Sequence, residues 1–199
     1  MGLTSCGGCI HARVCLRSRL STELFCPQVL LHSLGRAFGN LRLPLEVFFA
    51  WTAACGKILT VDNLRRRGMV VVNRCWLCES DGESIDHLLI HCGAARALWN
   101  AFFAWFGLCW VMPCSVKELL ASWWLSGRSR STVVWKMVPL CIMWCIWSER
   151  NNRCFEDSSR SIEELLHFFL FTLFSWTAGW LAPRVISFSD FLSFFSYSP

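Results

Sequence analysis

The stretch TVDNLRRRGMVVVNRCWLCESDGESIDHLLIHCG, residues 60–93, decides the fold because it holds four residues of the kinds that bind zinc. They follow the spacing Cys75-x2-Cys78-x8-His87-x4-Cys92. Zn²⁺ prefers thiolate and imidazole ligands in a tetrahedron, and a C-x2-C turn presents two sulfurs to one ion. We therefore expect this stretch to fold around Zn²⁺. Four protein ligands leave no open coordination position, so the predicted site is structural and adds folding free energy.

The fourth ligand has two candidates when only the residues are considered. His87 and His91 are spaced i,i+4 and would share one face of a helix, whereas His87 and Cys92 would be offset by about 140°. A site of Cys75, Cys78, His87 and His91 is therefore physically reasonable. For Cys92 to bind instead, the helix must tighten or end near His91, and Gly93 makes that ending easy.

Local signals predict a two-turn helix just before the first cysteine. Thr60 can accept a backbone N–H as the N-cap, Asp62 lies in the first turn, and Gly68 can take the left-handed conformation that ends a helix. The apolar run 69–72 then predicts a short strand that leads into Cys75. This order places the arginines at the end of the helix beside the ligand segment.

Further helices are predicted on both sides of this stretch from apolar patterns and caps. They are a short buried helix around 47–51 that ends before Gly56, a helix from Ser84 that ends near Gly93, a buried helix over 94–106, a helix over 132–150 with a kink at Pro139, and a helix from Ser161 to about 177. Residues 151–159 are predicted to form the polar connection between the last two helices.

The predicted fold class is mainly α, a small helical domain with a zinc knuckle and at most one short β-hairpin. We divide the chain into an irregular leader over 1–40, a unit over 41–106 that holds the zinc site, and a helical C-terminal region over 107–199. Few apolar residues lie between Cys75 and Cys92. Removal of the metal should therefore unfold the region 70–100 first.

The composition is unusually apolar for a globular chain of 199 residues, with 54% hydrophobic and 17% charged residues. Such a chain needs a membrane, a partner or a missing piece. The stretch 165–183 has no formal charge and reaches the length of a membrane span. Polar residues interrupt it and no basic cluster flanks it, so a buried or partner-seeking helix is favoured over a membrane anchor.

Cysteine usage indicates a reducing compartment. There are 13 cysteines, an odd count that fits no closed set of disulfides, and residues 1–20 lack the uninterrupted apolar run of a secretory signal. We therefore expect the nucleus or the cytoplasm. Cys6, Cys9, His11 and Cys15 could form a second metal cluster, but the single residue between Cys9 and His11 is tight for a tetrahedron, and chance clustering is favoured.

Four arginines near the ligand segment form the main basic feature: Arg65, Arg66, Arg67 and Arg74. Clustered arginines favour RNA, DNA or another polyanion through counterion release. A solvated helix end explains the run of three equally well.

The order and spacing of these residues resemble the zinc-binding domain that follows the polymerase in plant LINE-type, non-LTR retrotransposon reverse transcriptases. The resemblance covers about residues 41–105 and rests on Pro44, Phe48-Phe49-Ala50-Trp51, Gly56, Thr60-x-Asp62-Asn63-Leu64, Arg67-Gly68, Cys75-x-Leu77-Cys78, Glu83-Ser84-x-Asp86-His87-Leu88, Cys92, Ala95 and Leu98-Trp99. It implies Cys75, Cys78, His87 and Cys92 as the zinc ligands, in preference to His91. It also implies an assisting contact with element RNA or target DNA.

A looser similarity to stand-alone plant relatives covers 144–155, 173–176 and 188–191. The leader over 1–40 departs from the family, because it does not look like the segment that precedes the domain in full-length elements.

Catalysis is not expected. Polymerase chemistry needs magnesium ions held by aspartates, and in reverse transcriptases a Tyr-x-Asp-Asp turn supplies a pair of them. The single tyrosine, Tyr197, is followed by Ser and Pro, and no two aspartates are adjacent. The leading hypothesis is a non-catalytic zinc-binding module. The competing ones are a protein-interaction fragment that docks through exposed aromatic surface, and a small protein anchored in a membrane through 165–183.

Overall fold

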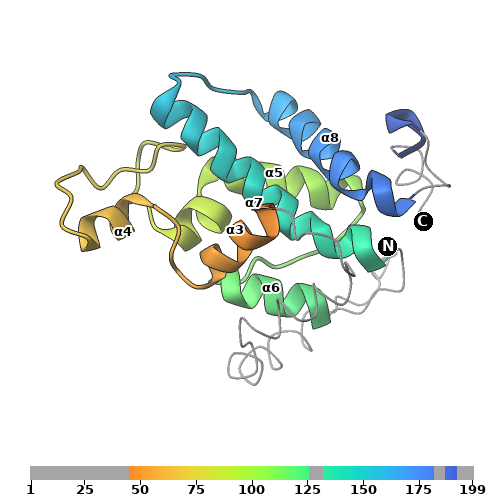
Figure 1. The fold of residues 1–199 in the computed structure, drawn as a ribbon, viewed down its shortest axis with the longest axis horizontal. Coiled ribbons are helices and arrows are strands. Elements are labelled where there is room, and N and C mark those ends of the chain that lie inside the picture. Colours follow the sequence, from red (N-terminus) through yellow and green to blue (C-terminus); the bar gives the residue numbers. More distant parts are fainter. Residues whose placement is uncertain (1–44, 126–131, 182–186, 192–199) are drawn as a thin grey trace, which may run out of the picture.

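The computed structural model describes residues 45–125, 132–181 and 187–191, and these residues are mainly helical, as predicted (Figure 1). The leader over 1–40 lies outside them. The elements are α3 (Leu45–Ala54), α4 (Val61–Arg66), a π-helical turn η1 (His87–His91), α5 (Gly93–Trp105), α6 (Val116–Leu125), α7 (Thr132–Phe155) and α8 (Ile162–Leu181).

The two longest helices, α7 and α8, pack against each other and carry most of the other elements. Figure 1 shows α7 and α8 side by side, and α5 packs against both of them while α3 packs against α7. Helix α4 and the loop that follows it lie at one end, on the left of this view. The turn η1 contacts α7 and α5. The predicted metal-ligand segment is therefore held between the end carrying α4 and the helical core.

One cluster of buried apolar residues runs through α3, η1 and α5 to α8. Its largest fully buried side chains include Trp99, Trp123, Phe102 and Phe169. The ring of Phe102 lies 5.8 Å from that of Phe169 and 6.1 Å from that of Trp123, so α5 joins α6 to α8 through aromatic contacts. Residues 41–106 and 107–199 both contribute to this core. The division of the chain into units over 41–106 and 107–199 stays a prediction from the sequence.

The helix predicted over 94–106 is confirmed as α5, and the short helix before Gly56 is confirmed as α3. Helix α5 is buried on one face only, because Arg96, Asn100 and Trp105 are exposed. The helix from Ser161 is also confirmed. Its first turn has a capping box, in which the Glu164 N–H donates to Ser161 Oγ at 3.2 Å and the Ser161 N–H donates to the Glu164 carboxylate at 2.7 Å.

The helix predicted over 132–150 is longer than expected and ends at Phe155. Residues 151–155 were wrongly assigned to a polar connection, because their polar side chains are satisfied on the helix. Arg153 Nε donates to Glu149 one turn earlier, and Arg150 Nη1 donates to the Asn151 side chain. The connection to α8 is correspondingly short.

Pro139 lies inside α7, and the helix continues through it. Proline has no N–H, so the carbonyl of Trp135, four residues earlier, loses its usual helical donor. The indole Nε1–H of Trp123 on α6 donates to this carbonyl at 2.9 Å. The proline thus creates the position where α6 bonds to α7.

The strand predicted over 69–72 is wrong. These residues form no regular secondary structure, and they pair with no strand in the described part of the chain. Val70 is 102% exposed and Val72 is 83% exposed, so this apolar run covers no sheet and no core. An apolar run of four residues without a partner cannot form a β-ladder.

None of the helices in the described ranges has the length and apolar character needed to cross a membrane. This applies to α8, which contains most of the stretch 165–183; residues 182 and 183 lie outside the described ranges. Leu165, Phe169 and Leu173 on α8 are buried in the core instead.

Candidate metal centre

Cys75, Cys78, His87 and Cys92 come together in the structure. Their four ligand atoms all lie within 4.8 Å of one another. The Cys75 and Cys92 sulfurs are 3.9 Å apart, and the Cys78 sulfur lies 3.3 Å from His87 Nε2. Cys75 and Cys92 are buried, while Cys78 and His87 are half-buried. The sequence spacing therefore corresponds to one compact cluster in space.

The first two cysteines lie on a tight turn closed by backbone bonds. The Glu79 N–H donates to the Cys75 carbonyl at 2.9 Å, and the Cys75 N–H donates to the Asp81 carbonyl at 2.7 Å. Glu79 has a φ of 57°, in the left-handed region that is uncommon for a residue with a side chain. This turn brings both sulfurs to the same side of the chain.

The π-helical turn η1 decides how His87 and Cys92 meet. Ser84 Oγ accepts the His87 N–H at 3.2 Å, which confirms Ser84 as a helix-starting residue. The Cys92 N–H then donates to the His87 carbonyl, five residues back, at 2.6 Å. The helix was expected to tighten or to end near His91. It ends there, but its last turn is wider than an α-helical turn. Cys92 leaves it with φ −55° and ψ 140° and becomes the N-cap residue of α5.

His91 lies outside this cluster. It is exposed, and its Nε2 lies 3.0 Å from the carbonyl oxygen of Cys114 in the segment before α6. The i,i+4 geometry that made His91 a candidate assumed a regular α-helix. The wider turn removes that geometry and brings Cys92 toward Cys75 instead.

The surroundings lower the pKa of two of the three cysteines, Cys78 and Cys92. The bond to Cys75 lowers the pKa of Cys92, which also lies near the backbone N–H groups of Ala94 and Ala95 at the start of α5. Burial alone would raise the pKa of Cys78, but the N–H groups of Asp81 and Ser80 lower it overall. The shared bond with Cys92 and burial together raise the pKa of Cys75.

His87 responds to the same sulfurs. Burial acts to lower its pKa, but the bond to Cys78 and the neighbouring Cys75 raise it overall. Three thiol groups and one imidazole, partly buried and each held by backbone structure, fit a tetrahedral ion of the zinc type. An ion held by all four would have no position left for a substrate or a reactive water, and it would supply folding free energy.

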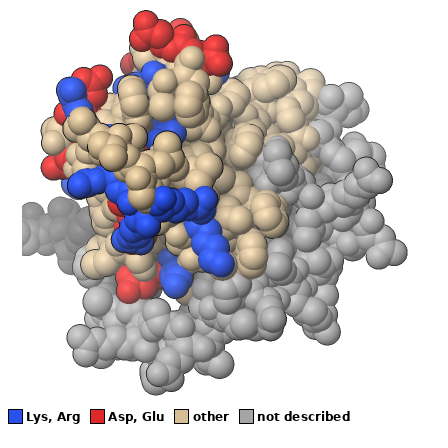
Figure 2. Space-filling view, turned by 60° about the vertical axis from the view of Figure 1, so that its left-hand side comes forward, with Lys and Arg blue, Asp and Glu red and all other residues tan. Residues whose placement is uncertain are grey.

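The four arginines lie on or near α4, and all are exposed. Two of them have acidic partners: Arg66 lies 3.4 Å from Asp62, and Arg74 lies 2.6 Å from Glu79. Figure 2 brings the side of the molecule that carries α4 forward and shows Lys and Arg side chains gathered across the middle of that face. All four arginines are therefore open to solvent, and Arg74 directly precedes the ligand Cys75 in sequence.

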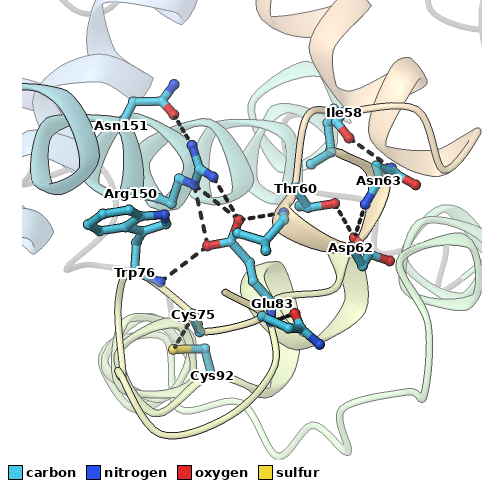
Figure 3. A network of polar contacts seen from close by, with 12 residues as sticks. Ile58, Thr60, Asp62, Asn63, Cys75, Trp76, Glu83, Cys92, Arg150 and Asn151 are labelled. Carbon is cyan, nitrogen blue, oxygen red and sulfur yellow. Dashed lines mark hydrogen bonds and ion pairs between the residues drawn. The ribbon is translucent and has the colours of Figure 1, made fainter. Parts of the chain in front are cut away.

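The role of Glu83 was not predicted from the sequence. Its carboxylate is fully buried and forms an ion pair of 2.8 Å with Arg150, which lies 67 residues away on α7 (Figure 3). The same carboxylate accepts the Val61 N–H at the start of α4 and the Trp76 N–H between the first two cysteines. Glu83 and Arg150 were noted only as parts of the family pattern. No local rule predicts a bond between residues so far apart in sequence.

The second cluster considered in the leader, Cys6, Cys9, His11 and Cys15, lies outside the described residues.

The fold and the cluster together define a small helical module with a candidate metal site of three cysteines and one histidine. Residues 39–99 match the family model described as zinc-binding in reverse transcriptase, so this part of the chain is similar to that family. The match contains all four clustered residues and ends within α5. Searches of curated proteins and of solved structures found no match.

Proposed function

We propose that the chain is a non-catalytic zinc-binding module derived from the reverse transcriptase of a plant LINE-type, non-LTR retrotransposon. The observation that carries the proposal is the meeting of Cys75, Cys78, His87 and Cys92 within 4.8 Å, inside the segment that matches the zinc-binding family. Zinc is the metal favoured by three thiolates and an imidazole in a closed site. The ion would hold the loop between α4 and α5 and would take no part in a reaction.

Zinc content of the reduced, purified protein tests this proposal. We expect one zinc per chain by elemental analysis, retained in His91→Ala and lost or strongly weakened in Cys92→Ser. The control is suited to the question because His91 and Cys92 are adjacent, and only Cys92 lies in the cluster. A chain without zinc would refute the metal site, and zinc lost only in His91→Ala would refute this ligand set.

Contact with RNA or DNA is the second part of the proposal. It is supported by the exposure of Arg65, Arg66, Arg67 and Arg74, which precede the first ligand in sequence. Arg65 and Arg67 have no acidic partner in the described ranges, so their charge is available to phosphate groups. The Arg66 and Arg74 side chains in their ion pairs are 74% and 57% exposed, so these pairs are weak.

Single-stranded RNA binding at low salt, measured by fluorescence anisotropy, tests this part. Replacement of all four arginines by alanine should weaken binding by about tenfold or more and should reduce its salt dependence. Arg96→Ala is the control, because Arg96 is exposed on α5 and lies outside the group. Unchanged binding after the fourfold replacement, or no binding by the wild-type chain, would refute nucleic-acid contact through these residues.

A protein partner is the alternative function, and the exposed Val70 and Val72 favour it. Both lie on the segment 69–75, which has no regular secondary structure and whose backbone pairs with no strand in the described ranges. Such a segment can add to the sheet edge of another protein. Association of this kind would persist at high salt and would be lost in a Val70→Ser, Val72→Ser double variant, whereas RNA binding would weaken with salt.

A further inference from the structure

The two residues between Cys75 and Cys78 are each held by a side chain from outside the turn. The Trp76 N–H donates to Glu83 Oε2 at 3.2 Å. The Leu77 carbonyl accepts from Arg153 Nη1 at 3.0 Å, and Arg153 lies on α7, 76 residues further along the chain. Two of the three peptide groups between Cys75 and Cys78 therefore depend on groups whose position is set elsewhere.

Glu83 is itself fixed by α7. The side chain of Arg150 is 4% exposed and that of Glu83 is 0% exposed, so their ion pair is shielded from water. Arg150 donates to Glu83 Oε1 through both Nε and Nη2, at 3.2 Å and 2.8 Å (Figure 3). Two charge-assisted bonds from one planar guanidinium fix the orientation of the carboxylate. The oxygen that receives the Trp76 N–H is thus positioned by a residue of α7.

Arg153 is fixed in a similar way. Its Nε donates at 2.8 Å to Glu149, whose side chain is 0% exposed. Glu149 also accepts from the Arg160 N–H at 2.9 Å, just before α8 begins. The guanidinium of Arg153 therefore has one side bonded to a buried carboxylate and the other to the Leu77 carbonyl. Its side chain is 27% exposed, so it can be changed without opening the core.

We propose that the last turns of α7 belong to the metal centre, with Arg153 and the Glu83–Arg150 pair as positioning residues that set the Cys75–Cys78 turn for the ion. This inference rests on the proposed zinc site, and it extends the metal-binding unit beyond residues 39–99. Groups that orient metal ligands typically affect metal affinity by about 10–100-fold. Binding of zinc and packing of α7 would then favour each other.

The test compares zinc affinity in full-length variants by competition with a chromophoric chelator. Arg153→Ala should weaken zinc binding by about tenfold or more. Arg153→Lys should recover part of the loss, because an ammonium group can still reach the Leu77 carbonyl or Glu149 but cannot repeat the planar contact to both. Arg96→Ala, an exposed arginine that follows the last ligand in sequence, should leave the affinity unchanged.

Two further measurements separate positioning from general stability. Cobalt-loaded Arg153→Ala should show an altered visible absorption spectrum, and its increase in melting temperature on adding zinc should be smaller than that of the wild-type protein. If Arg153 only stabilises the fold, the melting temperature falls equally with and without zinc, while zinc affinity and the cobalt spectrum stay unchanged. That result would overturn the proposal.

Far-ultraviolet circular dichroism shows whether each variant is folded. If Arg153→Ala is unfolded, Arg153→Lys decides the question: weaker zinc binding by a folded Arg153→Lys supports the proposal, and wild-type affinity overturns it. A wild-type chain that binds no zinc would instead refute the proposed function, so the two failures are distinguishable.

Discussion

Gly68 sets the direction in which the chain leaves α4 toward the metal ligands. Its φ is 87°, a backbone conformation that costs little only for glycine. The Gly68 N–H donates to the Arg65 carbonyl at 3.0 Å, and the Met69 N–H donates to the Leu64 carbonyl at 3.1 Å, as in a helix ending with a left-handed residue.

Replacement of Gly68 by alanine should therefore lower the free energy of unfolding by about 1 kcal/mol. A β-carbon at this position meets no atom within 4 Å, so the cost is backbone strain alone. Gly93→Ala is the matched control: its added β-carbon also meets nothing within 4 Å, and its φ is not positive. Urea denaturation of the zinc-loaded proteins measures both, and equal stability of Gly68→Ala and wild type would contradict this account.

At the scale of single residues, contacts between sequence neighbours could be predicted and distant ones could not. Gly68 and the capping residues Ser84 and Ser161 behave as predicted, since each acts on backbone within a few positions. Thr60 does not cap α4 with its side chain. Its hydroxyl donates to Asp62 at 2.5 Å, and the first N–H groups of the helix have other acceptors. Glu83 accepts those of Val61 and Asp62, and the Asp62 carboxylate accepts that of Asn63. The bond of Val61 depends on a residue 22 positions away.

The same distinction applies to the metal centre. The Cys75-x2-Cys78 pair could be read from spacing, because a turn of this length brings two sulfurs together whatever surrounds it. The choice between His91 and Cys92 could not be derived from an ideal helix. It depends on the π-helical turn, whose residues Leu88, Leu89 and Ile90 are all fully buried. The resemblance named Cys92, and the geometry places the Cys92 sulfur in the cluster.

At the scale of elements, α6 was not predicted, although its start carries a recognisable pattern. Ser115-x-x-Glu118 precedes the apolar residues of this helix, and the Glu118 N–H donates to Ser115 Oγ at 3.3 Å. Asp86 also accepts the Val116 N–H at 2.8 Å, so a residue beside the metal ligands caps the start of α6. The short capping pattern was available from the sequence, and the contribution of Asp86 was not.

The bond between Trp123 and Trp135 gives a prediction for the packing of α6 on α7. Trp123→Phe should lower the free energy of unfolding by about 1–2 kcal/mol. The Trp135 carbonyl, four residues before Pro139, would lose its hydrogen-bond donor, while the ring contact between residues 123 and 135 would remain. Trp110→Phe is the control, since the buried Nε1 of Trp110 has no hydrogen-bond partner in the described part of the chain. Denaturant unfolding of Trp110→Phe should differ little from wild type, and an equal loss in both variants would refute the assigned role of the bond.

At the scale of the whole molecule, the segment that matches the zinc-binding family does not enclose its own core. Leu98 and Trp99 near the end of the match are fully buried in the cluster that also contains residues of α6, α7 and α8. Two ion-paired arginines of α7 add polar contacts to the ligand loop.

Helix positions follow from local pattern, whereas the pairing of helices depends on side chains far apart in sequence. This is why the mainly helical class could be predicted from the sequence. The shared core of the regions 41–106 and 107–199 could not be predicted.

This arrangement narrows the expected effect of removing the metal. From the sequence, the whole region 70–100 is expected to unfold first, because few apolar residues separate Cys75 from Cys92. Leu88, Leu89 and Ile90 are nevertheless fully buried, and so are Leu98 and Trp99 on α5. Between Cys75 and Ser84, Leu77 is the single buried apolar side chain, at 6% exposure. The loop 75–82 has the least to hold it once the ion is gone.

We therefore expect that chelation under reducing conditions, followed by amide hydrogen exchange, increases exchange mainly over 75–82. Residues 94–105 and 140–146 should stay protected, since their buried side chains do not depend on the ion. Zinc added back should restore protection of the loop, which controls for damage by the chelator. Loss of protection across α5 and α7 as well would mean that the metal holds the whole core, and that burial of Leu88 to Ile90 is insufficient without it.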